Sequence, residues 1–294
     1  MHRTPTWRTF LLAVVVALLL ATPVLTGCRG EDDTSTDVEK NSEDTSGASD
    51  PDAGSSKQPI EVEVYFVRGE GLGVSVRSIP STTQVAHAAL RELLARPDAQ
   101  ESGFGLTSEI PDGTTLNSVS IADGRATVDL SSSFDDGGGS LSMQMRAAQI
   151  VYTLTQFPTV TTVDFELDGE PIEALGGEGI DVVGVSREDF TNVLPMILVE
   201  RPAPGQTVTS PVRLSGLANT FEATFVAKVT DSDGNVLTEE VVTYDGSMGS
   251  WAVFDVSLEF ETEDLGLGTV VVYEQSAKDG KPINVVEIPV RMKP

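Results

Sequence analysis

The residue with the clearest chemistry is Cys28, the single cysteine of the 294-residue chain. It follows Leu25, Thr26 and Gly27, and this run comes directly after an apolar stretch. Leu-x-Gly-Cys at such a place is the pattern of a lipobox, in which the thiol takes a diacylglycerol and the chain is cut between Gly27 and Cys28. Stable membrane attachment takes about two acyl chains, and a diacylglyceryl cysteine carries both. We therefore predict that Cys28 is lipidated, with palmitate as a typical acyl group.

Residues 1–27 have the layout of a secretory signal peptide. Arg3 and Arg8 give a positive start, an apolar stretch runs from Phe10 to about Leu20, and small residues precede the cut. The stretch holds about 15 mostly apolar residues, fewer than the roughly 20 of a membrane-crossing helix. The alternative is a signal anchor that stays uncleaved. We expect cleavage, so that Cys28 holds the chain at the extracytoplasmic face of the cell membrane.

Other side chains that could do chemistry are few. A lipidated Cys28 leaves no thiol, and His2 departs with the signal peptide, so His87 is the only histidine left. This excludes Cys/His zinc sites, Ser-His-Asp triads and Cys-His dyads. His87 lies between the apolar positions of an expected helix, and we interpret it as a boundary or surface histidine rather than a catalytic group.

Acidic residues are plentiful, and some are grouped. The run 231–234, Asp-Ser-Asp-Gly, begins like a calcium loop, but the twelfth-position glutamate and flanking helices of an EF-hand are absent, which favours a hairpin turn. Asp135 and Asp136, in a Gly-rich loop, could bind a cation, although a solvated tip is favoured. Paired carboxylates could cleave a glycosidic bond, yet among 45 acidic residues some lie close by chance. We therefore assign no catalytic, metal or cofactor-binding residue.

The charge balance excludes one class of partner. Lys and Arg number 19 against 45 Asp and Glu, a formal charge of −26, which becomes −28 once Arg3 and Arg8 leave with the signal peptide. Because binding to nucleic acid depends on cations that meet phosphates, no nucleic acid partner is expected. The same charge keeps the chain off anionic lipid, which suits a protein held on a tether.

Residues 28–58 are predicted to be a disordered acidic tether. Asp, Glu, Ser, Thr and Gly dominate, and Val38 is the only large aliphatic residue. Such a segment cannot bury enough apolar surface to offset its ordering entropy. Thirty residues of coil reach on the order of 30 Å, so the tether would lift the folded part of the chain off the membrane. The remaining length fits two domains.

The first domain is expected over residues 59–192 and has an α+β pattern. Apolar alternation predicts strands, and Ser-Thr-Thr-Gln at 81–84 has the spacing of a capping box that opens a helix. The second helix is apolar around much of its circumference, so we expect it to be central and buried. The order β-β-α-β-β-α-β indicates two helices on one mixed β-sheet, with strands at 60–67, 74–79, 116–121, 125–130 and 160–167 and helices at 81–95 and 141–157.

Several motifs of this domain resemble the GerMN family. They are GLTSEIPDGT (105–114), ATVDLS (126–131) with Phe134, QIVYTLTQFP (149–158) and the Asp168-Gly169 turn, and they cover most of residues 60–190. The resemblance implies an α+β fold similar to the modules that assemble rings in envelope machines. It also implies a lipoprotein or membrane-anchored protein of the sporulation and germination group in Gram-positive bacteria, without catalytic residues. The motifs' polar residues have ordinary roles: Thr153, Thr155 and Gln156 near a helix end, and Asp129 bonded to the backbone of a turn.

The second domain, residues 196–294, is predicted to be an all-β immunoglobulin-like sandwich. About seven short strands alternate with Gly, Pro and Asp turns, and no helix is convincing. Without a cysteine pair, the core is expected to rely on Trp251, Phe225, Phe254 and Tyr273 besides aliphatic residues. The domain resembles the Gmad-type immunoglobulin-like module that accompanies GerMN in spore germination proteins, on the motifs PAPG (202–205), SPV (210–212), GLAN (216–219), FE (221–222) and GSW (249–251).

These patterns together predict a non-catalytic, membrane-anchored envelope lipoprotein that acts in protein assembly or cell-wall association. Its expected partners are the membrane, through the lipid on Cys28, and an envelope protein or peptidoglycan. Two alternatives stay open. One is a carboxylate-based hydrolase or binding protein acting on cell-wall glycan, and the other is a calcium- or small-ligand-binding lipoprotein.

Overall fold

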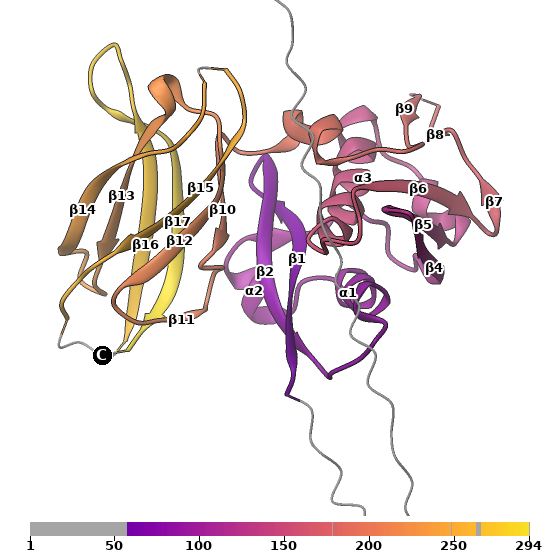
Figure 1. The fold of residues 1–294 in the computed structure, drawn as a ribbon, viewed down its shortest axis with the longest axis horizontal. Coiled ribbons are helices and arrows are strands. Elements are labelled where there is room, and N and C mark those ends of the chain that lie inside the picture. Colours follow the sequence, from indigo (N-terminus) through magenta and orange to yellow (C-terminus); the bar gives the residue numbers. More distant parts are fainter. Residues whose placement is uncertain (1–57, 178, 248, 263–265, 294) are drawn as a thin grey trace, which may run out of the picture. The chain divides into compact units, whose positions relative to one another are not determined.

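A computed structural model describes residues 58–177, 179–247, 249–262 and 266–293 (Figure 1). The described residues belong to one compact unit. The expected signal peptide and nearly all of the expected tether, including Gly27 and Cys28, lie outside the described residues. Within the described ranges, none of the helices has the length and apolar character that crossing a membrane requires.

The first domain contains two larger sheets besides a small two-stranded one, β8-β9. One has the antiparallel strand order β2-β1-β3, and the other has the order β4-β5-β6-β7, in which β5 and β6 run parallel. The expected α+β class and the order of the main elements are confirmed, but the strands are divided between two sheets instead of forming one. The strands are β1 (Ile60–Arg68), β2 (Gly71–Ile79), β3 (Leu106–Thr107), β4 (Leu116–Ala122), β5 (Arg125–Leu130), β6 (Thr162–Leu167), β7 (Glu170–Pro171), β8 (Ala174–Leu175) and β9 (Ile180–Asp181).

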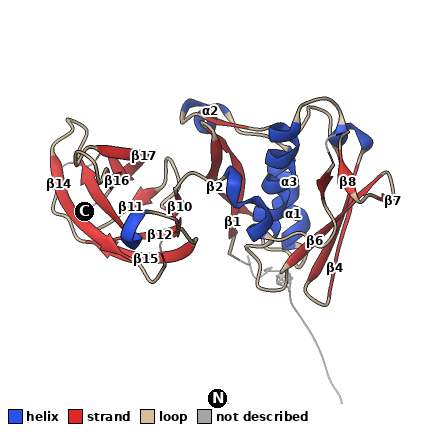
Figure 2. Cartoon of the chain, turned by 90° about the horizontal axis from the view of Figure 1, so that it is seen from above, coloured by secondary structure: helices blue, strands red, loops and turns tan. Residues whose placement is uncertain are grey.

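Two helices lie between these sheets. Figures 1 and 2 show α1 (Val85–Leu94) and α3 (Ser140–Leu154) with β1 and β2 on one side and β4 to β6 on the other. Eleven of the 15 residues of α3 are buried, which confirms the expected central helix. Leu141, which we expected inside, is 60% exposed because it belongs to the first turn, next to the exposed residues 137–140.

The predicted capping box at residues 81–84 was wrong. The N-cap of α1 is Gln84, whose side chain makes no capping bond, and the Thr82 hydroxyl accepts the N–H of Gln84 (3.0 Å) in the preceding turn. The capping box instead opens the short helix α2 (Ala99–Gly103), where the Asp98 carboxylate accepts the N–H of Glu101 at 2.8 Å and the Glu101 carboxylate accepts the N–H of Asp98 at 2.7 Å.

The second domain is a sandwich of two sheets, with strand orders β10-β12-β15 and β11-β17-β16-β13-β14. This arrangement of seven or so strands in two facing sheets is that of an immunoglobulin-like fold, as predicted. The strands are β10 (Ile197–Arg201), β11 (Thr207–Val208), β12 (Val212–Ala218), β13 (Thr224–Thr230), β14 (Val236–Thr243), β15 (Ala252–Leu258), β16 (Leu267–Gln275) and β17 (Pro282–Met292).

The core of the sandwich contains two of the four aromatic residues expected there. Phe225 and Phe254 meet edge to face, with ring centroids 4.9 Å apart. Trp251 is half-buried and packs against the hydrophobic cluster centred on the first domain, not against the sandwich core. Tyr273 points to the opposite face of its sheet from Val270 and Val272, because successive side chains alternate along a strand. The expectation for Trp251 and Tyr273 was therefore wrong.

Candidate functional site

The polar side chains of the buried helix α3 bind the backbone of β1. Gln149, Thr153 and Gln156 lie at i, i+4 and i+7, which places them on one face of the helix and its end. The Gln149 amide donates to the carbonyl of Tyr65 (3.2 Å), and the Thr153 hydroxyl accepts the N–H of Tyr65 (3.1 Å). The Gln156 amide accepts the N–H of Glu63 (2.8 Å) and donates to its carbonyl (2.6 Å).

These contacts satisfy backbone groups on the edge of the first sheet that no neighbouring strand reaches. The partner strand β3 pairs only with Val67 and Arg68, at the end of β1. The backbone of Glu63 and Tyr65 is therefore open on that side, and buried backbone groups without partners are costly. Side chains of α3 supply the missing hydrogen bonds, which fixes the helix against the strand.

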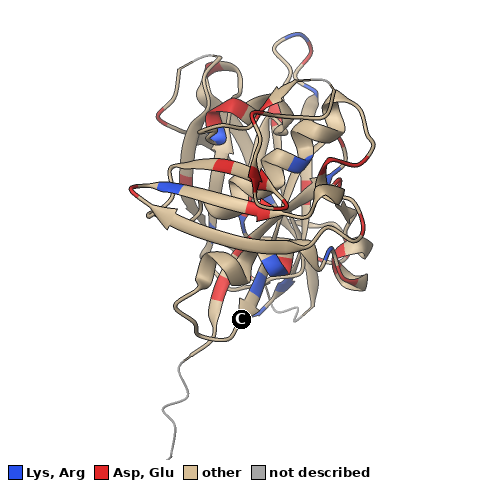
Figure 3. Ribbon diagram, turned by 90° about the vertical axis from the view of Figure 1, so that its right-hand side faces the viewer, with Lys and Arg blue, Asp and Glu red and all other residues tan. Residues whose placement is uncertain are grey.

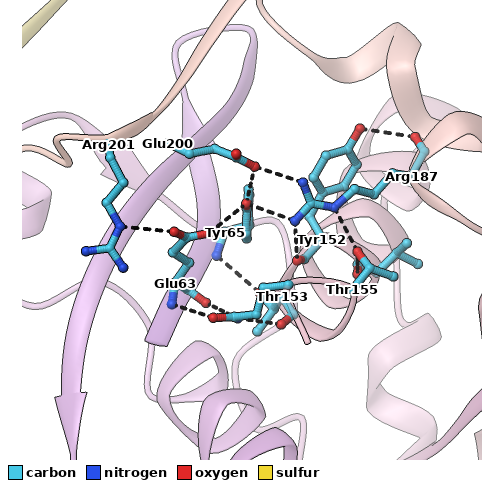
Figure 4. A network of polar contacts seen from close by, with 10 residues as sticks. Glu63, Tyr65, Tyr152, Thr153, Thr155, Arg187, Glu200 and Arg201 are labelled. Carbon is cyan, nitrogen blue, oxygen red and sulfur yellow. Dashed lines mark hydrogen bonds and ion pairs between the residues drawn. The ribbon is translucent and has the colours of Figure 1, made fainter. Parts of the chain in front are cut away.

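Arg187 is the centre of a second set of contacts at the junction of the two domains (Figure 4). It belongs to the 3-10 helix η2 (Arg187–Val193), which leads from the first domain toward β10. Its guanidinium donates to the Thr155 hydroxyl (2.9 Å), the Glu200 carboxylate (2.8 Å) and the Tyr65 hydroxyl (3.0 Å). It also lies over the ring of Tyr152, 4.7 Å from the centroid. The Tyr65 hydroxyl in turn donates to Glu200.

A second arginine extends this network along the same two strands. Arg201, the last residue of β10, pairs with Glu63 (3.1 Å) and Glu61 (2.8 Å) of β1. We refer to Tyr65, Glu63, Arg187, Glu200 and Arg201 as the junction network. Because β1 belongs to the first domain and β10 to the second, the junction network ties the two domains to each other.

At neutral pH the electrostatics of the junction network keep Tyr65 protonated and Arg187 charged. Burial raises the pKa of Tyr65 well above its usual value, and the nearby Glu200 carboxylate raises it further. Burial alone would lower the pKa of Arg187, but Tyr65 and Glu200 raise it above its usual value. A protonated tyrosine and a charged arginine serve as hydrogen-bond donors, so the network can hold the two domains together.

The histidine and the aspartates weighed from the sequence as possible catalytic or metal-binding residues are not members of this network. His87 is half-buried on α1. Asp231 accepts the N–H of Asp233 (3.0 Å) and of Asn235 (2.8 Å), so the run 231–235 is the hairpin turn between β13 and β14, as predicted. Across the ranges that the structure describes, no three His, Asp or Glu side chains come together in a way that could hold a metal ion.

Two further acidic residues support turns. The Asp129 carboxylate accepts the N–H of Gly169 (3.0 Å), which confirms its predicted bond to a turn backbone. Asp135, considered a solvated tip, accepts the N–H of Gly176 (2.6 Å) and so joins two loops. Figure 3 marks acidic residues in red and basic residues in blue along the ribbon, and both kinds occur in strands, helices and loops.

Sequence reasoning missed the junction network. Tyr65, Arg187 and Glu200 lie far apart in the sequence, and only the fold brings them together. The helix contacts had a visible signal, because Gln149, Thr153 and Gln156 are polar residues at the spacing of one face in and just after the apolar second half of α3. The expected role of Thr155 and Gln156 near the helix end is confirmed by their bonds.

Comparisons with known proteins agree with the division of the chain into two domains. Residues 63–173 match the family model Germane, described as sporulation and spore germination, and residues 196–281 match Gmad2, the immunoglobulin-like domain of bacterial spore germination. No curated protein matches the chain.

Three solved structures are similar to this chain. The first GerMN domain of the sporulation protein GerM from Bacillus subtilis is 25% identical, with 44% of this chain and 98% of that chain covered and a TM-score of 0.39. The tandem GerMN domains of the same protein are 18% identical, with 70% and 64% covered and a TM-score of 0.39. A putative lipoprotein from Clostridium perfringens is 21% identical, with 47% and 93% covered and a TM-score of 0.34. The domain assignment rests on the family models.

Proposed function

Because residues 63–173 are a Germane domain and residues 196–281 are a Gmad2 immunoglobulin-like domain, we propose that this protein is a non-catalytic envelope lipoprotein. In this proposal Cys28 carries the lipid, and the acidic tether connects it to the two folded domains. Both domains lie at the outer face of the cytoplasmic membrane. There they act in protein assembly or in association with the cell wall.

The junction network is the observation that supports this proposal most. Tyr65, Arg187 and Glu200 bind one another across the two domains, and the polar residues of the 149–158 motif bind the backbone of β1. The polar groups of the recognisable motifs thus hold the first domain together, and the junction network joins the two domains into one body. A body of this kind presents surfaces to partners, which is what an assembly component requires.

Metabolic labelling with a clickable palmitate analogue tests the anchor. The wild-type chain should take up label, and the Cys28→Ala variant should lose it and leave the membrane fraction. The Thr26→Ala variant is a matched control within the same motif and should keep the label, since Leu, Gly and Cys remain in place. Equal labelling of wild type and Cys28→Ala would show that the lipid-anchor proposal is wrong.

Incubation of the full chain with purified peptidoglycan tests the non-catalytic role. Both forms of the proposal predict that no soluble fragments appear. Wall association also predicts that the protein sediments with peptidoglycan, whereas a role in protein assembly alone predicts that it stays in solution. Release of soluble glycan fragments above a heat-denatured control would contradict the proposal and favour a glycan hydrolase. Crosslinking in cells followed by purification through the full chain then identifies protein partners.

A further inference from the structure

The strand β4 forms an open edge of the first domain. It ends the sheet β4-β5-β6-β7 and pairs with β5 on one side only. Five of its seven residues are exposed. Among the described strands of more than two residues that end a sheet, β4 alone has no charged residue, and the others include Arg77 in β2, Glu200 in β10, Glu239 in β14 and Asp255 in β15. Because charged residues discourage strand pairing at an edge, β4 lacks the protection that the other edges have.

Backbone groups of β4 point toward this open side. The turn from β4 to β5 consists of two residues with positive φ (51° and 83°), and the pair Ala122 and Arg125 closes it. A two-residue hairpin loop is closed by a hydrogen-bonded pair, and along an antiparallel ladder such pairs alternate with pairs whose N–H and C=O groups point away from the partner strand. The N–H and C=O groups of Val119 and Ile121 therefore face the open edge.

A hollow of about 500 Å³ lies at the start of this edge, between β4 and the helix α1. The helix packs against β4, and the helical residues that line the hollow are three, four or eight positions apart, which places them on one face. Strand edge and helix together form a groove. The lining residues are His87, Arg91, Leu94, Ala95, Thr114, Thr115 and Leu116.

The hollow attracts negative charge. The Arg91 guanidinium is exposed, and within the described part of the chain it has no ion-pair or hydrogen-bond partner. His87, one helical turn earlier, adds a ring N–H. None of the described residues that line the hollow has a carboxylate, and the nearby Glu92 and Asp112 are in ion pairs with other arginines (3.2 and 3.0 Å). The hollow is therefore a local surplus of positive charge in a chain of formal charge −26.

We propose that β4 binds an extended peptide of a partner protein as an added strand, with a carboxylate of that peptide held by Arg91 and His87 in the hollow. In antiparallel pairing, which is slightly more stable than parallel pairing, the C-terminal end of the peptide reaches the start of β4. The carboxylate therefore belongs to the last residues of the peptide, either as an acidic side chain or as the chain terminus. Main-chain bonds at Val119 and Ile121 provide affinity, and the hollow provides register and specificity.

A second copy of the chain fits this edge less well. The two-fold axis that would pair β4 with its own copy runs through the sheet, so α1 of both chains would lie on the same face of it. The paired strands would be about 4.8 Å apart, whereas packed helices keep roughly 8–10 Å between their axes. A peptide brings no such helix. The proposal rests on the protein-assembly role proposed above and deepens it, because it names the chemistry of the partner.

Fluorescence anisotropy with synthetic peptides and the full chain tests the recognition of a carboxylate. Three dye-labelled peptides of nine residues alternate valine and threonine. The first ends in a free carboxylate, the second is amidated and has a glutamate near its C-terminal end, and the third is amidated and has neither. The first or the second should bind at least tenfold more tightly than the third, and the tighter of the two identifies the source of the carboxylate. Equal binding of all three, or no binding at millimolar concentration, would overturn the proposal.

A charge exchange at Arg91 tests the hollow. A fourth peptide has lysine in place of the glutamate and is otherwise the second peptide. The wild type should prefer the glutamate peptide at least tenfold, and Arg91→Glu should prefer the lysine peptide, an exchange that a folding defect could not produce. Arg213→Glu, which changes an exposed arginine of β12 in the second domain, is the matched control and should keep the wild-type preference. An unchanged preference in Arg91→Glu would contradict the assignment of the hollow.

Proline at Ile121 tests the pairing along the edge. Proline is tolerated on an edge strand where its nitrogen faces solvent, so Ile121→Pro should keep the fold, which circular dichroism checks, but lose the outward N–H. Peptide affinity should fall at least tenfold. Ile121→Thr keeps both the N–H and a β-branched side chain and should stay within threefold of the wild type. Equal affinity of Ile121→Pro and Ile121→Thr would show that the peptide does not pair with β4.

Sedimentation of the free chain tests the other occupant. A dimer that the glutamate peptide dissociates would assign the edge to a second copy and overturn the proposal, whereas a monomer supports it. Failure of this proposal and failure of the proposed function remain distinguishable. If Cys28 is labelled and envelope partners are captured while no peptide binds, only the edge is wrongly assigned. If Cys28→Ala keeps its label, the anchor is wrong, and peptide binding that depends on Arg91 would still support the edge.

Discussion

The two domains solve the same problem, an exposed strand edge, in different ways. In the first domain, Gln149 and Thr153 of the buried helix α3 and Gln156, just after its end, bind the open edge of β1. In the second domain, β14 ends its sheet with Glu239 and Glu240 exposed to solvent. Charged residues on an edge strand discourage pairing with another strand. One domain thus satisfies its edge internally, and the other protects it by charge.

The interiors of the two domains also differ, because the first uses buried polar side chains and the second is almost entirely apolar. The centre of the first domain contains fully buried polar side chains, such as Gln149 and Thr153, each bonded to backbone. The core of the second domain is aromatic and aliphatic, around Phe225 and Phe254. Directional bonds fix one arrangement of helix and strand, whereas an apolar core mainly needs the right volume. We infer that stability depends on individual polar residues in the first domain and at the junction more than in the sandwich.

The largest expected effect is at the junction. Arg187→Met removes bonds to Thr155, Glu200 and Tyr65 while it keeps the stem of the side chain, and it leaves partly buried acceptors unpaired. Loss of one partner of such a pair should lower the free energy of unfolding by about 3 kcal/mol. Chemical denaturation followed by circular dichroism measures this loss.

Arg213→Met is the matched control. Arg213 makes a two-pronged contact with Asp255 (2.8 and 2.6 Å) within the second domain, but both side chains are solvent-exposed. Exposed ion pairs contribute little, so this variant should remain close to the wild type. Equal losses in Arg187→Met and Arg213→Met would remove the distinction between the junction and the sandwich.

A smaller effect is expected inside the first domain. Thr153→Val keeps the shape of the side chain but leaves the buried N–H of Tyr65 without its acceptor, which should cost about 2 kcal/mol. In the second domain, Thr230→Val removes only a long contact to the carbonyl of Thr269 (3.4 Å) and should cost less than about 1 kcal/mol. Denaturation midpoints of the two variants check the order, and a larger loss for Thr230→Val would reverse the comparison.

The smallest expected effect is a dependence on alkaline pH. Burial raises the pKa values of Tyr65 and Tyr152 above the usual 10.0, so the folded protein holds these protons when the unfolded chain releases them. Stability is therefore complete below pH 10 and falls above it, by about 1.4 kcal/mol per pH unit for each tyrosine that stays protonated. Unfolding measured from pH 8 to 11 should show this decline, with a shallower slope in Tyr152→Phe. A slope unchanged by that substitution would exclude Tyr152 as a source.

Sequence patterns predicted most of the fold, because strands and turns are signalled by residues close to one another in the chain. Alternation predicted the strands, the Asp168-Gly169 motif predicted a turn whose two residues have positive φ, and the run from Asp231 predicted a hairpin turn. The wrong assignments are those that local pattern cannot decide. Trp251 and Tyr273 are large and apolar in either setting, and the side of the sheet on which each lies depends on register and on what packs there.

By itself the sequence determined the two domain types, the order of the elements and the chemistry predicted for Cys28, since each depends on residues adjacent in the chain. Only the tertiary structure decided that the helices lie between two sheets and that α3 completes the edge of β1. It also decided that Arg187, Tyr65 and Glu200 meet at the junction of the domains. These features join residues separated by up to 135 positions. Contacts of that kind arise from how the elements pack, and no periodicity along the chain encodes them.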